Sequence, residues 1–317
     1  GWKAVNMMRC FQGDRKMKHG KKCKIDKYPL ILIVLLLLLT GLVIAWKLPQ
    51  KEDRYIHVGI AVYDRSDTFM ESYIRELEDK IGQTKILGKK VSYEIYDAEG
   101  IGSRQEKQLQ EMYAQDYDVM LVNLVEPASA ASVLTDAKDA DIPVILFNRE
   151  IDEKDLKISK NVWYVGTDAR AAGVMQGKLL KDLWKKQSRI LDWNGNGMLD
   201  YVLVEGEESH FDAIRRTSGF LETGAELPLN QKGNILAEWK RELAYEKFAA
   251  LDDEAVQNVE AVICNNDDMA LGVYDYYKEK NLKLPVIIGI NNSEEMHQKI
   301  MSGEMYGTID NKMEDQV

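Results

Sequence analysis

Apolar, β-branched runs alternate with amphipathic helical segments from residue 55 to residue 302, and this rhythm restricts the fold more than any other feature. The predicted strands are residues 55–63, 89–98, 117–125, 141–150, 162–168, 199–206, 233–239, 259–267 and 285–291. The predicted helices are residues 68–81, 105–115, 128–140, 169–184, 211–221, 241–251, 269–280 and 294–302. Apolar strands separated by helices of about 10–15 residues predict parallel sheets covered on both faces. Because the rhythm restarts near Val162, we predict an α/β protein of two doubly wound parallel-sheet lobes, joined by a hinge and facing each other across a cleft.

The segment 28–46 is apolar throughout and close to the length of about 20 residues that a membrane-spanning helix needs. Seven Lys and Arg side chains crowd residues 15–27 on its N-terminal side, which predicts a cytoplasmic N-terminus. We therefore expect a basic cytoplasmic stretch at residues 1–27, a transmembrane anchor or signal segment at residues 28–46, and an extracytoplasmic body. A retained anchor is favoured, with cleavage after the small residue Ala45 as the alternative.

The charge of the body excludes some classes of partner. Residues 1–51 carry eleven Lys and Arg against two acids, so totals of 42 and 52 leave 31 and 50 for the rest, a net charge of −19. Such an acidic body is unsuited to binding nucleic acid or anionic membranes. Cys264 is the only cysteine after the apolar segment, so the body holds no internal disulfide.

Polar side chains follow most of the predicted strands. Ligands of doubly wound sheets bind at the carboxyl ends of the strands, where this chain places Asp and Asn with a few aromatic residues. These are Asp64, Asp67, Phe69, Asn123, Asn148, His210, Asp212, Trp239, Asn265, Asn266, Asn291, Asn292 and Asn311. Amides and carboxylates can each grip two hydroxyls while rings cover C–H faces, so the pattern favours an uncharged ligand with many hydroxyls. His210 has no Ser or Cys partner in a nucleophile motif and no phosphate-binding glycine loop occurs, so we predict a binding protein rather than an enzyme.

The stretch "LDWNGNGMLD" has the oxygen spacing of a calcium loop. Side-chain oxygens at alternate positions, one backbone carbonyl and a turn glycine come from Asp192, Asn194, Asn196, Gly197, Met198 and Asp200. The twelfth position, where such a loop needs a glutamate, is Leu203 in a buried strand. Either the site is broken or its last carboxylate comes from elsewhere in the chain.

From about His57 to the C-terminus, the chain resembles the periplasmic sugar-binding proteins of bacterial ABC importers, in particular those that bind glucose and galactose. The resemblance is carried by "GIAVYDRSDTFM", "VNLVEPASA", "IPVILFNRE", "YVGTDARAAG", "DWNGNGMLDYVLVEGEESHFDAIRR", "VICNNDDMALG" and "SGEMYGTIDN". The calcium loop that runs directly into a sugar-contact strand is specific to that subgroup. The two-lobe fold, known as type I, is shared with many binding proteins and with LacI-type regulators.

The resemblance implies a division of the body and a mechanism. One lobe would comprise residues 54–167 with 310–317, and the other residues 168–309, with crossings at residues 167–168 and 310–311. A glucose- or galactose-like monosaccharide would close the hinge, and an ABC permease would receive it. The alternative is a membrane-anchored sugar sensor that signals to a chemoreceptor or histidine kinase. We expect a monomer in either case.

The resemblance also implies ten sugar contacts. They are Asp67, Phe69, Asn148, His210, Asp212, Arg216, Trp239, Asn266, Asn291 and Asn311. Asp67 and Asn148 would grip the far hydroxyls, Arg216 would lie near the ring oxygen, and Phe69 and Trp239 would sandwich the sugar. The alternatives are a core position on an amphipathic helix for Phe69 and a neighbour of a helix N-terminus for His210, and the "AEW" context of Trp239 is less distinctive.

Glu260 matches the distant glutamate with which the family closes its calcium loop. The implied calcium ligands are therefore Asp192, Asn194, Asn196, the Met198 carbonyl, Asp200 and Glu260.

Two departures from the family pattern affect the expected function. Asn291 replaces an aspartate that accepts from the sugar, so we expect weaker hexose binding or a shifted preference. The family also continues beyond the position of Val317 with a last inter-lobe crossing, and without such a continuation we expect weaker closure and lower stability.

Overall fold

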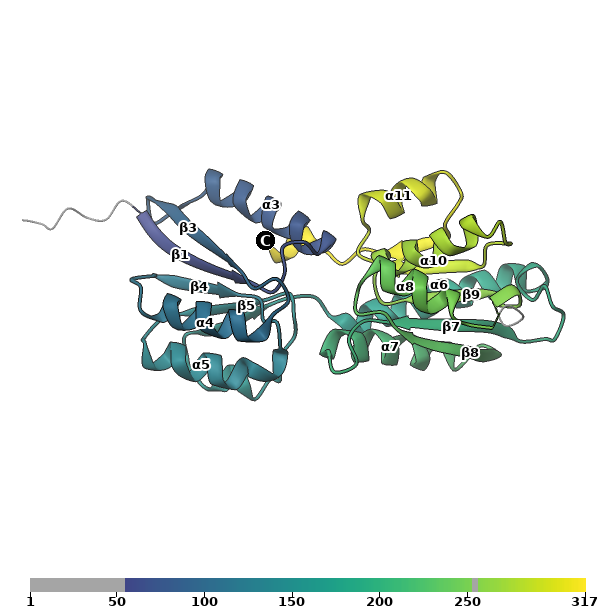
Figure 1. Ribbon diagram of the computed structural model, residues 1–317, viewed down its shortest axis with the longest axis horizontal. Helices are drawn as coiled ribbons and strands as arrows, with labels where there is room; N and C mark the ends of the chain where they lie inside the picture. Colours follow the sequence, from purple (N-terminus) through teal and green to yellow (C-terminus); the bar gives the residue numbers. More distant parts are fainter. Residues whose placement is uncertain (1–54, 253–255) are drawn as a thin grey trace, which may run out of the picture. The chain divides into compact units, whose positions relative to one another are not determined.

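A computed structural model describes residues 55–252 and 256–317 of the protein (Figure 1). The predicted apolar segment at residues 28–46 lies outside these ranges. Within them, no helix combines the length and apolar character needed to cross a membrane.

The first sheet has six strands in the order β2-β3-β1-β4-β5-β6. Its strands are β1 (Tyr55–Val62), β2 (Lys85–Ile86), β3 (Lys89–Asp97), β4 (Val119–Val122), β5 (Val144–Phe147) and β6 (Val162–Val165). All neighbours pair in parallel except the β2–β3 hairpin, which the sequence pattern did not predict. The hairpin turns at Leu87 and Gly88, which both have positive φ, 52° and 81°.

Helices cover both faces of the first sheet (Figure 1). They are α3 (Thr68–Gln83), α4 (Gly102–Tyr113), α5 (Ala130–Asp139) and the short C-terminal α12 (Met313–Gln316), with 3-10 turns at Pro127–Ser129 and Asp155–Lys157. Alternate residues of β1 point to opposite faces, as the two-residue period of a strand requires. Val58, Ile60 and Val62 pack with α3, while Ala61 packs with α4 and α5. We call this sheet with its helices the first lobe.

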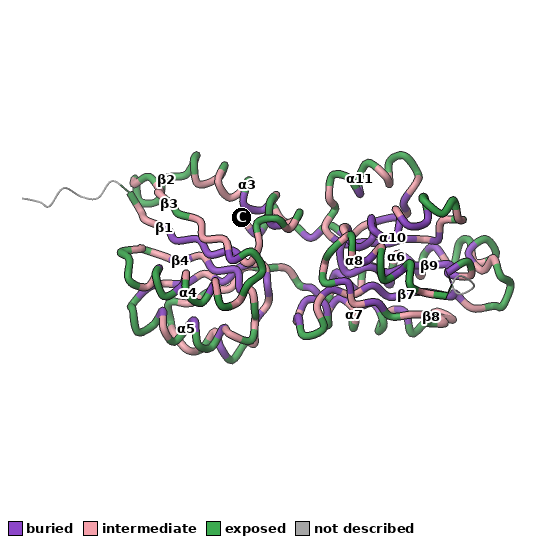
Figure 2. The backbone as a smooth tube through the Cα atoms, in the orientation of Figure 1, coloured by how far each residue is buried: buried purple, intermediate pink, exposed green. Residues whose placement is uncertain are grey.

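The second sheet has five parallel strands in the order β11-β10-β9-β7-β8. Its strands are β7 (Leu199–Glu205), β8 (Leu229–Leu236), β9 (Ala261–Cys264), β10 (Val286–Ile290) and β11 (Gly307–Ile309). Its helices are α6 (Ala169–Leu191), α7 (Phe211–Gly224), α8 (Arg241–Ala249), α10 (Asp267–Glu279) and α11 (Glu294–Met301). One apolar cluster joins α6 and α7 to one face, and another joins α8, α10 and α11 to the opposite face. Figure 2 shows the buried strands inside these helical layers, and we call this unit the second lobe.

Helices α6 and α7 pack backbone to backbone because glycines line their contact. A Cβ atom at Gly173 would lie 1.9 Å from the carbonyl oxygen of Arg216, and one at Gly219 would lie 2.2 Å from that of Arg170. This contact brings α7 close to the sheet edge where the polar strand ends gather.

Two segments connect the lobes, one between β6 and α6 and the other between β11 and α12. The Thr167 hydroxyl donates to Asn311 Oδ1 at 2.6 Å and so links one connection to the other. The C-terminal helix α12 returns to the first lobe, where Tyr73 donates to the Gln316 carbonyl at 2.9 Å.

The observed elements differ from the predicted ones mainly at their ends. Helix α6 continues to Leu191, beyond the predicted end at residue 184, although Gln187 departs from helical φ and ψ. Strand β8 begins at Leu229, four residues before the prediction, because it lies at the sheet edge where polar side chains interrupt the apolar pattern. The α/β class with parallel sheets is confirmed.

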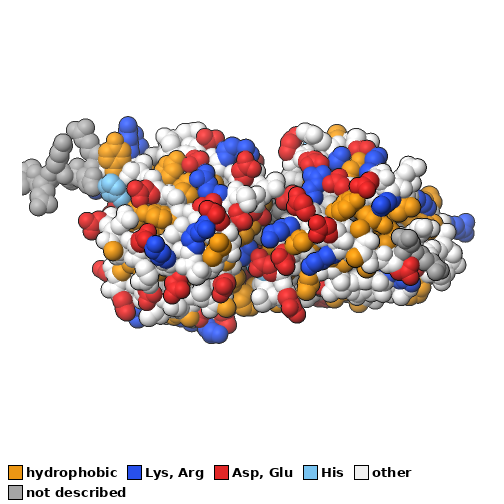
Figure 3. Space-filling model, in the orientation of Figure 1, with side chains coloured by type: hydrophobic (Ala, Val, Ile, Leu, Met, Phe, Trp, Pro, Cys, Tyr) orange, Lys and Arg blue, Asp and Glu red, His pale blue; other side chains and the backbone are white. Residues whose placement is uncertain are grey.

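Acidic and basic side chains are mixed on the face seen in Figure 3.

Candidate binding site

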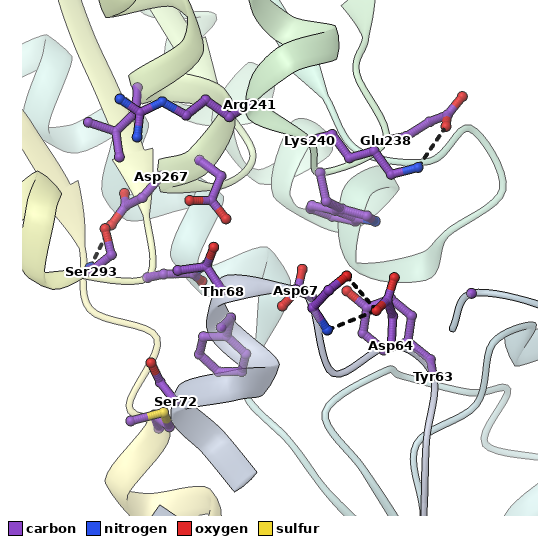
Figure 4. Close-up of a pocket in the computed structure, with 18 of the residues that line it drawn as sticks. Tyr63, Asp64, Asp67, Thr68, Ser72, Glu238, Lys240, Arg241, Asp267 and Ser293 are labelled. Carbon is purple, nitrogen blue, oxygen red and sulfur yellow. Dashed lines mark hydrogen bonds and ion pairs between the residues drawn. The ribbon is translucent and has the colours of Figure 1, made fainter. Parts of the chain in front are cut away.

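All ten predicted contact residues line one small cavity, together with Tyr63 and Arg149. The lining residues are Tyr63, Asp67, Phe69, Asn148, Arg149, His210, Asp212, Arg216, Trp239, Asn266, Asn291 and Asn311. This cavity has a volume of about 40 Å³. A larger hollow of about 940 Å³, shown in Figure 4, shares six of these residues. The structure thus brings the predicted set together, and its role in sugar binding remains a prediction.

The first lobe contributes residues that follow the ends of β1 and β5. Asp67 caps α3 through Oδ1, which accepts from the Met70 N–H at 2.8 Å, and its carboxylate also accepts a hydrogen bond from the Tyr63 hydroxyl. Phe69 lies in the first turn of α3 with its ring half-buried and its centroid 6.2 Å from that of Tyr73. It therefore contacts the core on one side and the cavity on the other. Asn148 follows β5 with φ of 63°, which aims its amide at the cavity.

Asn123, a predicted strand-end residue, supports the cavity from behind. Its side chain is fully buried, and its Nδ2 donates to the Phe147 carbonyl at 3.0 Å and to Asn148 Oδ1 at 3.3 Å. Its Oδ1 accepts from the Tyr63 N–H at 3.3 Å. Gln105 from α4 holds the same loop, because its amide donates to the Asn123 carbonyl at 2.8 Å. Asn123 therefore fixes Asn148 instead of facing the cavity.

The second lobe contributes three residues from the start of α7. His210 caps the helix through Nδ1, which accepts from the Asp212 N–H at 3.2 Å. Arg216 lies in the second turn of α7 and also faces the cavity. Its Nη1 donates to the Asn265 carbonyl at 2.6 Å. The side chains of His210, Asp212 and Arg216 are all buried. Their common wall therefore combines a neutral ring, an acid and a base.

Trp239 follows β8 with φ of 66°, and its half-buried ring lies against the backbone of Gly206. A Cβ atom at Gly206 would lie 2.3 Å from two ring atoms, so only glycine permits this position. Asn266 donates to the Trp239 carbonyl at 2.9 Å, and the His210 ring packs edge-on at 5.2 Å between centroids. Gly206 and His210 therefore hold the ring, while Asn266 holds the backbone that carries it.

Asn291 and Asn311 complete the wall at the ends of β10 and β11. Asn291 has φ of 135°, in the region that non-glycine residues rarely adopt. Its N–H donates to the Ile309 carbonyl at 2.8 Å. Asn311 is buried, and its Oδ1 accepts the Thr167 hydroxyl described above.

Four buried polar atoms around this cavity have no hydrogen-bond partner within residues 55–252 and 256–317. They are Asp212 Oδ1, Arg216 Nε, Trp239 Nε1 and Asn291 Oδ1. Leaving a buried polar atom unpaired costs about 1–3 kcal/mol, and proteins seldom tolerate several in one place. Two donors and two acceptors facing one space are suited to a ligand whose groups both donate and accept, as hydroxyls do.

Burial sets the charge state of the cavity wall. It lowers the pKa of His210 to about 2, assisted by the positive charges of Arg149 and Arg216, so the imidazole is neutral at physiological pH. Burial also raises the pKa of Asp212, and the nearby Arg216 and Arg149 partly oppose that shift. The wall thus offers a neutral imidazole beside a carboxyl balanced by two guanidinium groups.

Tyr63 and Arg149 also line this cavity, although neither was predicted as a contact from the sequence. The Arg149 guanidinium lies 3.7 Å from the centroid of the Tyr63 ring. Its Nη1 donates to the Val125 carbonyl at 2.7 Å and its Nη2 to Glu207 at 2.9 Å. Both residues stand directly at the ends of predicted strands, which was the available signal, but only their packing shows that they face inward.

The predicted calcium loop packs against buried Glu260 and donates backbone N–H groups to its carboxylate. Glu260 is 0% exposed, and its carboxylate accepts from the Asp200 N–H at 2.9 Å and the Asn194 N–H at 3.3 Å. Gly195 and Gly197 have φ of 70° and 78°, as the sharp turns of such a loop require. The register of β7 and β9 brings Glu260 to the loop, because its N–H donates to the Asp200 carbonyl at 2.8 Å.

The loop carries carboxylate, amide and carbonyl oxygens, the kinds of ligand that hard cations take. Burial raises the pKa of Glu260, and the neighbouring negative charge of Asp200 adds to that shift. Amides of Asn194, Asn196 and Asn230 donate to the Asp200 carboxylate at 3.0, 3.3 and 2.6 Å. No three His, Cys, Asp or Glu side chains of the described ranges form a metal-binding group, so a cation in this loop would need amide and carbonyl oxygens as well. Calcium remains a prediction for it.

Residues 58–317 match the family model of the periplasmic binding protein domain, and the chain belongs to this family. It is 33% identical over 263 residues to the D-galactose/methyl-galactoside binding periplasmic protein MglB of Haemophilus influenzae, covering 80% of this chain and 75% of the relative. It is 27% identical over 248 residues to the galactofuranose-binding protein YtfQ of Escherichia coli, covering 76% and 74%.

Among solved structures, the Caulobacter myo-inositol binding protein bound to myo-inositol has the same fold. The TM-score is 0.70 at 23% identity, and the match covers 85% of this chain and 86% of that one. The fructose-binding periplasmic domain of the hybrid two-component system BT1754 matches with a TM-score of 0.68 at 20% identity, covering 82% and 81%. These two likenesses concern the fold. The predicted family is confirmed.

Proposed function

We propose that this protein is an extracytoplasmic solute-binding protein that holds a glucose- or galactose-like monosaccharide and delivers it to an ABC permease. One observation carries the proposal. Ten residues chosen from sequence motifs ring one cavity, and four buried polar atoms there lack a partner among the described residues. The two rings, Phe69 and Trp239, supply the apolar surface that a pyranose needs on its C–H faces.

Different polar residues of the cavity would contact different groups of the sugar. Asp67 and Asn148 stand on the first lobe, where they would accept and donate to the far hydroxyls. Arg216, with its unpaired Nε, would donate to the ring oxygen or the anomeric hydroxyl. Because His210 is neutral, its imidazole adds no charge to a site intended for an uncharged ligand.

The choice of sugar rests on this site together with the relatives. Their names include D-galactose, galactofuranose, xylitol and ribose, so the family serves several polyhydroxyl ligands. Asn291 keeps an unpaired acceptor in the cavity wall. Its neutral amide forms weaker bonds than a carboxylate, so we propose lower hexose affinity or a changed preference between epimers.

We further propose that the loop at residues 192–200 binds calcium as a structural ion. Asp192, Asn194, Asn196, the Met198 carbonyl, Asp200 and Glu260 would hold it. A bound divalent cation supplies charge that offsets the buried carboxylates. It would thereby fasten the loop that leads into β7.

Closure of the two lobes would convey the presence of sugar to a membrane partner. A ligand that contacts both lobes shifts the equilibrium toward the closed state by the contacts it makes only there. A permease is the proposed reader, and no catalysis is needed. The alternative reader is a chemoreceptor or histidine kinase, which the fold permits because a fructose-binding domain of a hybrid two-component system shares it. Permease and ATPase genes beside this one would favour import, and a kinase gene would favour sensing.

Calorimetry with glucose, galactose, xylose and ribose tests the proposal, with calcium present. We expect micromolar or tighter binding of one hexose. Asp212→Asn should weaken it by about tenfold or more, because a charge-assisted bond contributes about 1.5–3 kcal/mol. Asp79→Asn is the matched control, since Asp79 is exposed on α3 and away from the cavity. Silence of the wild-type protein with every sugar would remove the monosaccharide assignment.

A further inference from the structure

Asp267 lies in the first turn of α10 and lines the larger hollow together with Asn291 (Figure 4). Its side chain is 1% exposed. Its Oδ2 accepts from the Ser293 N–H at 2.7 Å, an interaction marked in Figure 4, and its Oδ1 accepts from the Thr308 hydroxyl at 2.6 Å. Thr308 Oγ1 in turn accepts from the Asn292 N–H at 3.2 Å. One carboxylate therefore holds the backbone after Asn291 directly and through a hydroxyl.

The backbone that it holds is strained. Asn291 has φ of 135° and Asn292 has φ of 56°. Such conformations cost on the order of 1–3 kcal/mol each and persist only where the surroundings enforce them. Asp267 and Thr308 accept hydrogen bonds from the backbone N–H groups of Ser293 and Asn292, the two residues that follow Asn291.

The chain makes room for this carboxylate. A Cβ atom at Gly289 would lie 2.2 Å from Asp267 Oδ1, so β10 must pass it without a side chain. Burial raises the pKa of Asp267, and the bonds from Thr308 and Ser293 and the charge of Arg216 oppose that shift. Arg216 lines the cavity, so the carboxylate also balances a charge of the ligand wall.

We propose that Asp267 is a positioning residue for ligand selection: it fixes the strained Asn291 loop and thereby sets which hydroxyls the Asn291 amide can reach. The inference rests on the proposed monosaccharide site. A carboxylate can accept from both Ser293 and Thr308, whereas an amide has one acceptor oxygen and would oppose a donor to one of them. Loss of either bond frees the loop.

The test measures affinity and selectivity in a double-mutant cycle. Asp267→Asn is combined with Asn291→Ala, and binding of glucose and galactose is followed by calorimetry. We expect Asp267→Asn to weaken the preferred sugar by about tenfold, equivalent to one hydrogen bond, and to reduce the preference between the two epimers. In the Asn291→Ala background, the same substitution should change affinity by less than about twofold, because coupled residues are non-additive.

Thr308 supplies a milder pair of variants in case Asp267→Asn does not fold. Thr308→Val removes the bridging hydroxyl and should reproduce the loss of selectivity, whereas Thr308→Ser keeps the hydroxyl and should bind like the wild type. A lower melting temperature with unchanged affinity ratio, or an equal loss in both backgrounds, would overturn the inference alone. Wild-type protein that binds none of the sugars would overturn the proposed function and this inference together.

Discussion

Gly173→Ala tests whether the contact between α6 and α7 sets the geometry of the site. The added Cβ atom would lie 1.9 Å from the Arg216 carbonyl oxygen, 2.7 Å from its carbonyl carbon and 2.9 Å from the Phe220 nitrogen. All three are backbone atoms, so no side chain can turn aside. The helices must separate by roughly 1.5 Å to restore ordinary contact in a close-packed interior. Helix α7 carries Asp212 and Arg216, so both would move away from the other walls of the cavity.

The expected cost combines two opposing effects. Overpacking typically costs about 1–3 kcal/mol, while replacing glycine by alanine within a helix returns about 0.5–1 kcal/mol. We expect a net loss of about 1–2 kcal/mol in the free energy of unfolding. Displacing Arg216 by this amount should also remove a charge-assisted bond of about 1.5–3 kcal/mol, which lowers ligand affinity by about 10- to 100-fold.

Urea denaturation gives the free energy of unfolding, and calorimetry with the best-binding hexose gives the affinity. Gly82→Ala is the matched control because nothing lies within 4 Å of a Cβ atom there, on the exposed side of α3. We expect it to leave affinity unchanged and stability equal or up to about 1 kcal/mol higher. If Gly173→Ala behaves like this control in both assays, the close helix contact does not position the binding residues.

Three further predictions concern the ion, the histidine and the tryptophan. A chelator should lower the melting temperature, since calcium at about 100 times its Kd adds about 2.7 kcal/mol, and Glu260→Gln should abolish this response; an unchanged melting curve would mean an empty loop. The pKa of His210, lowered to about 2 from 6.5, makes the unfolded state bind the extra proton, so stability should fall as pH drops below about 6.5, by up to about 1.4 kcal/mol per pH unit. Urea unfolding at pH 7 and 5 should show a smaller difference for His210→Gln, and an equal difference would contradict the assignment. Gly206→Ala should displace the Trp239 ring and weaken sugar binding by about tenfold, whereas Gly233→Ala, whose nearest neighbour would be 3.6 Å away, should bind normally.

The sequence alone determined the fold class and most of the candidate site. Fully apolar strands between helices require a sheet buried on both faces, which in turn requires parallel pairing. The polar residues that end those strands indicated a binding edge, and the resemblance to sugar-binding proteins implied the contacts Asp67, Asn148, Arg216 and the other residues of the set. Local chemistry was equally readable, since Asp67 and Asn266 cap α3 and α10 through their side chains.

Only the tertiary structure decided which strand-end residues face the cavity and which support it. Asn123 and Asn148 look alike in sequence, yet one is fully buried behind the other. Asp267 adjoins the contact residue Asn266 but turns away to hold a loop that lies 26 residues later in sequence. Arg149 faces inward because its guanidinium stacks on the Tyr63 ring and donates to the Glu207 carboxylate.

The physical reason is the range over which a sequence pattern carries information. Periodicity reports the face on which a side chain lies, because strands repeat every two residues and helices every 3.6. It does not report which distant segment lies opposite. That depends on strand order, register and the close approach of layers, as when the adjacency of β7 and β9 brings Glu260 to a loop 60 residues earlier.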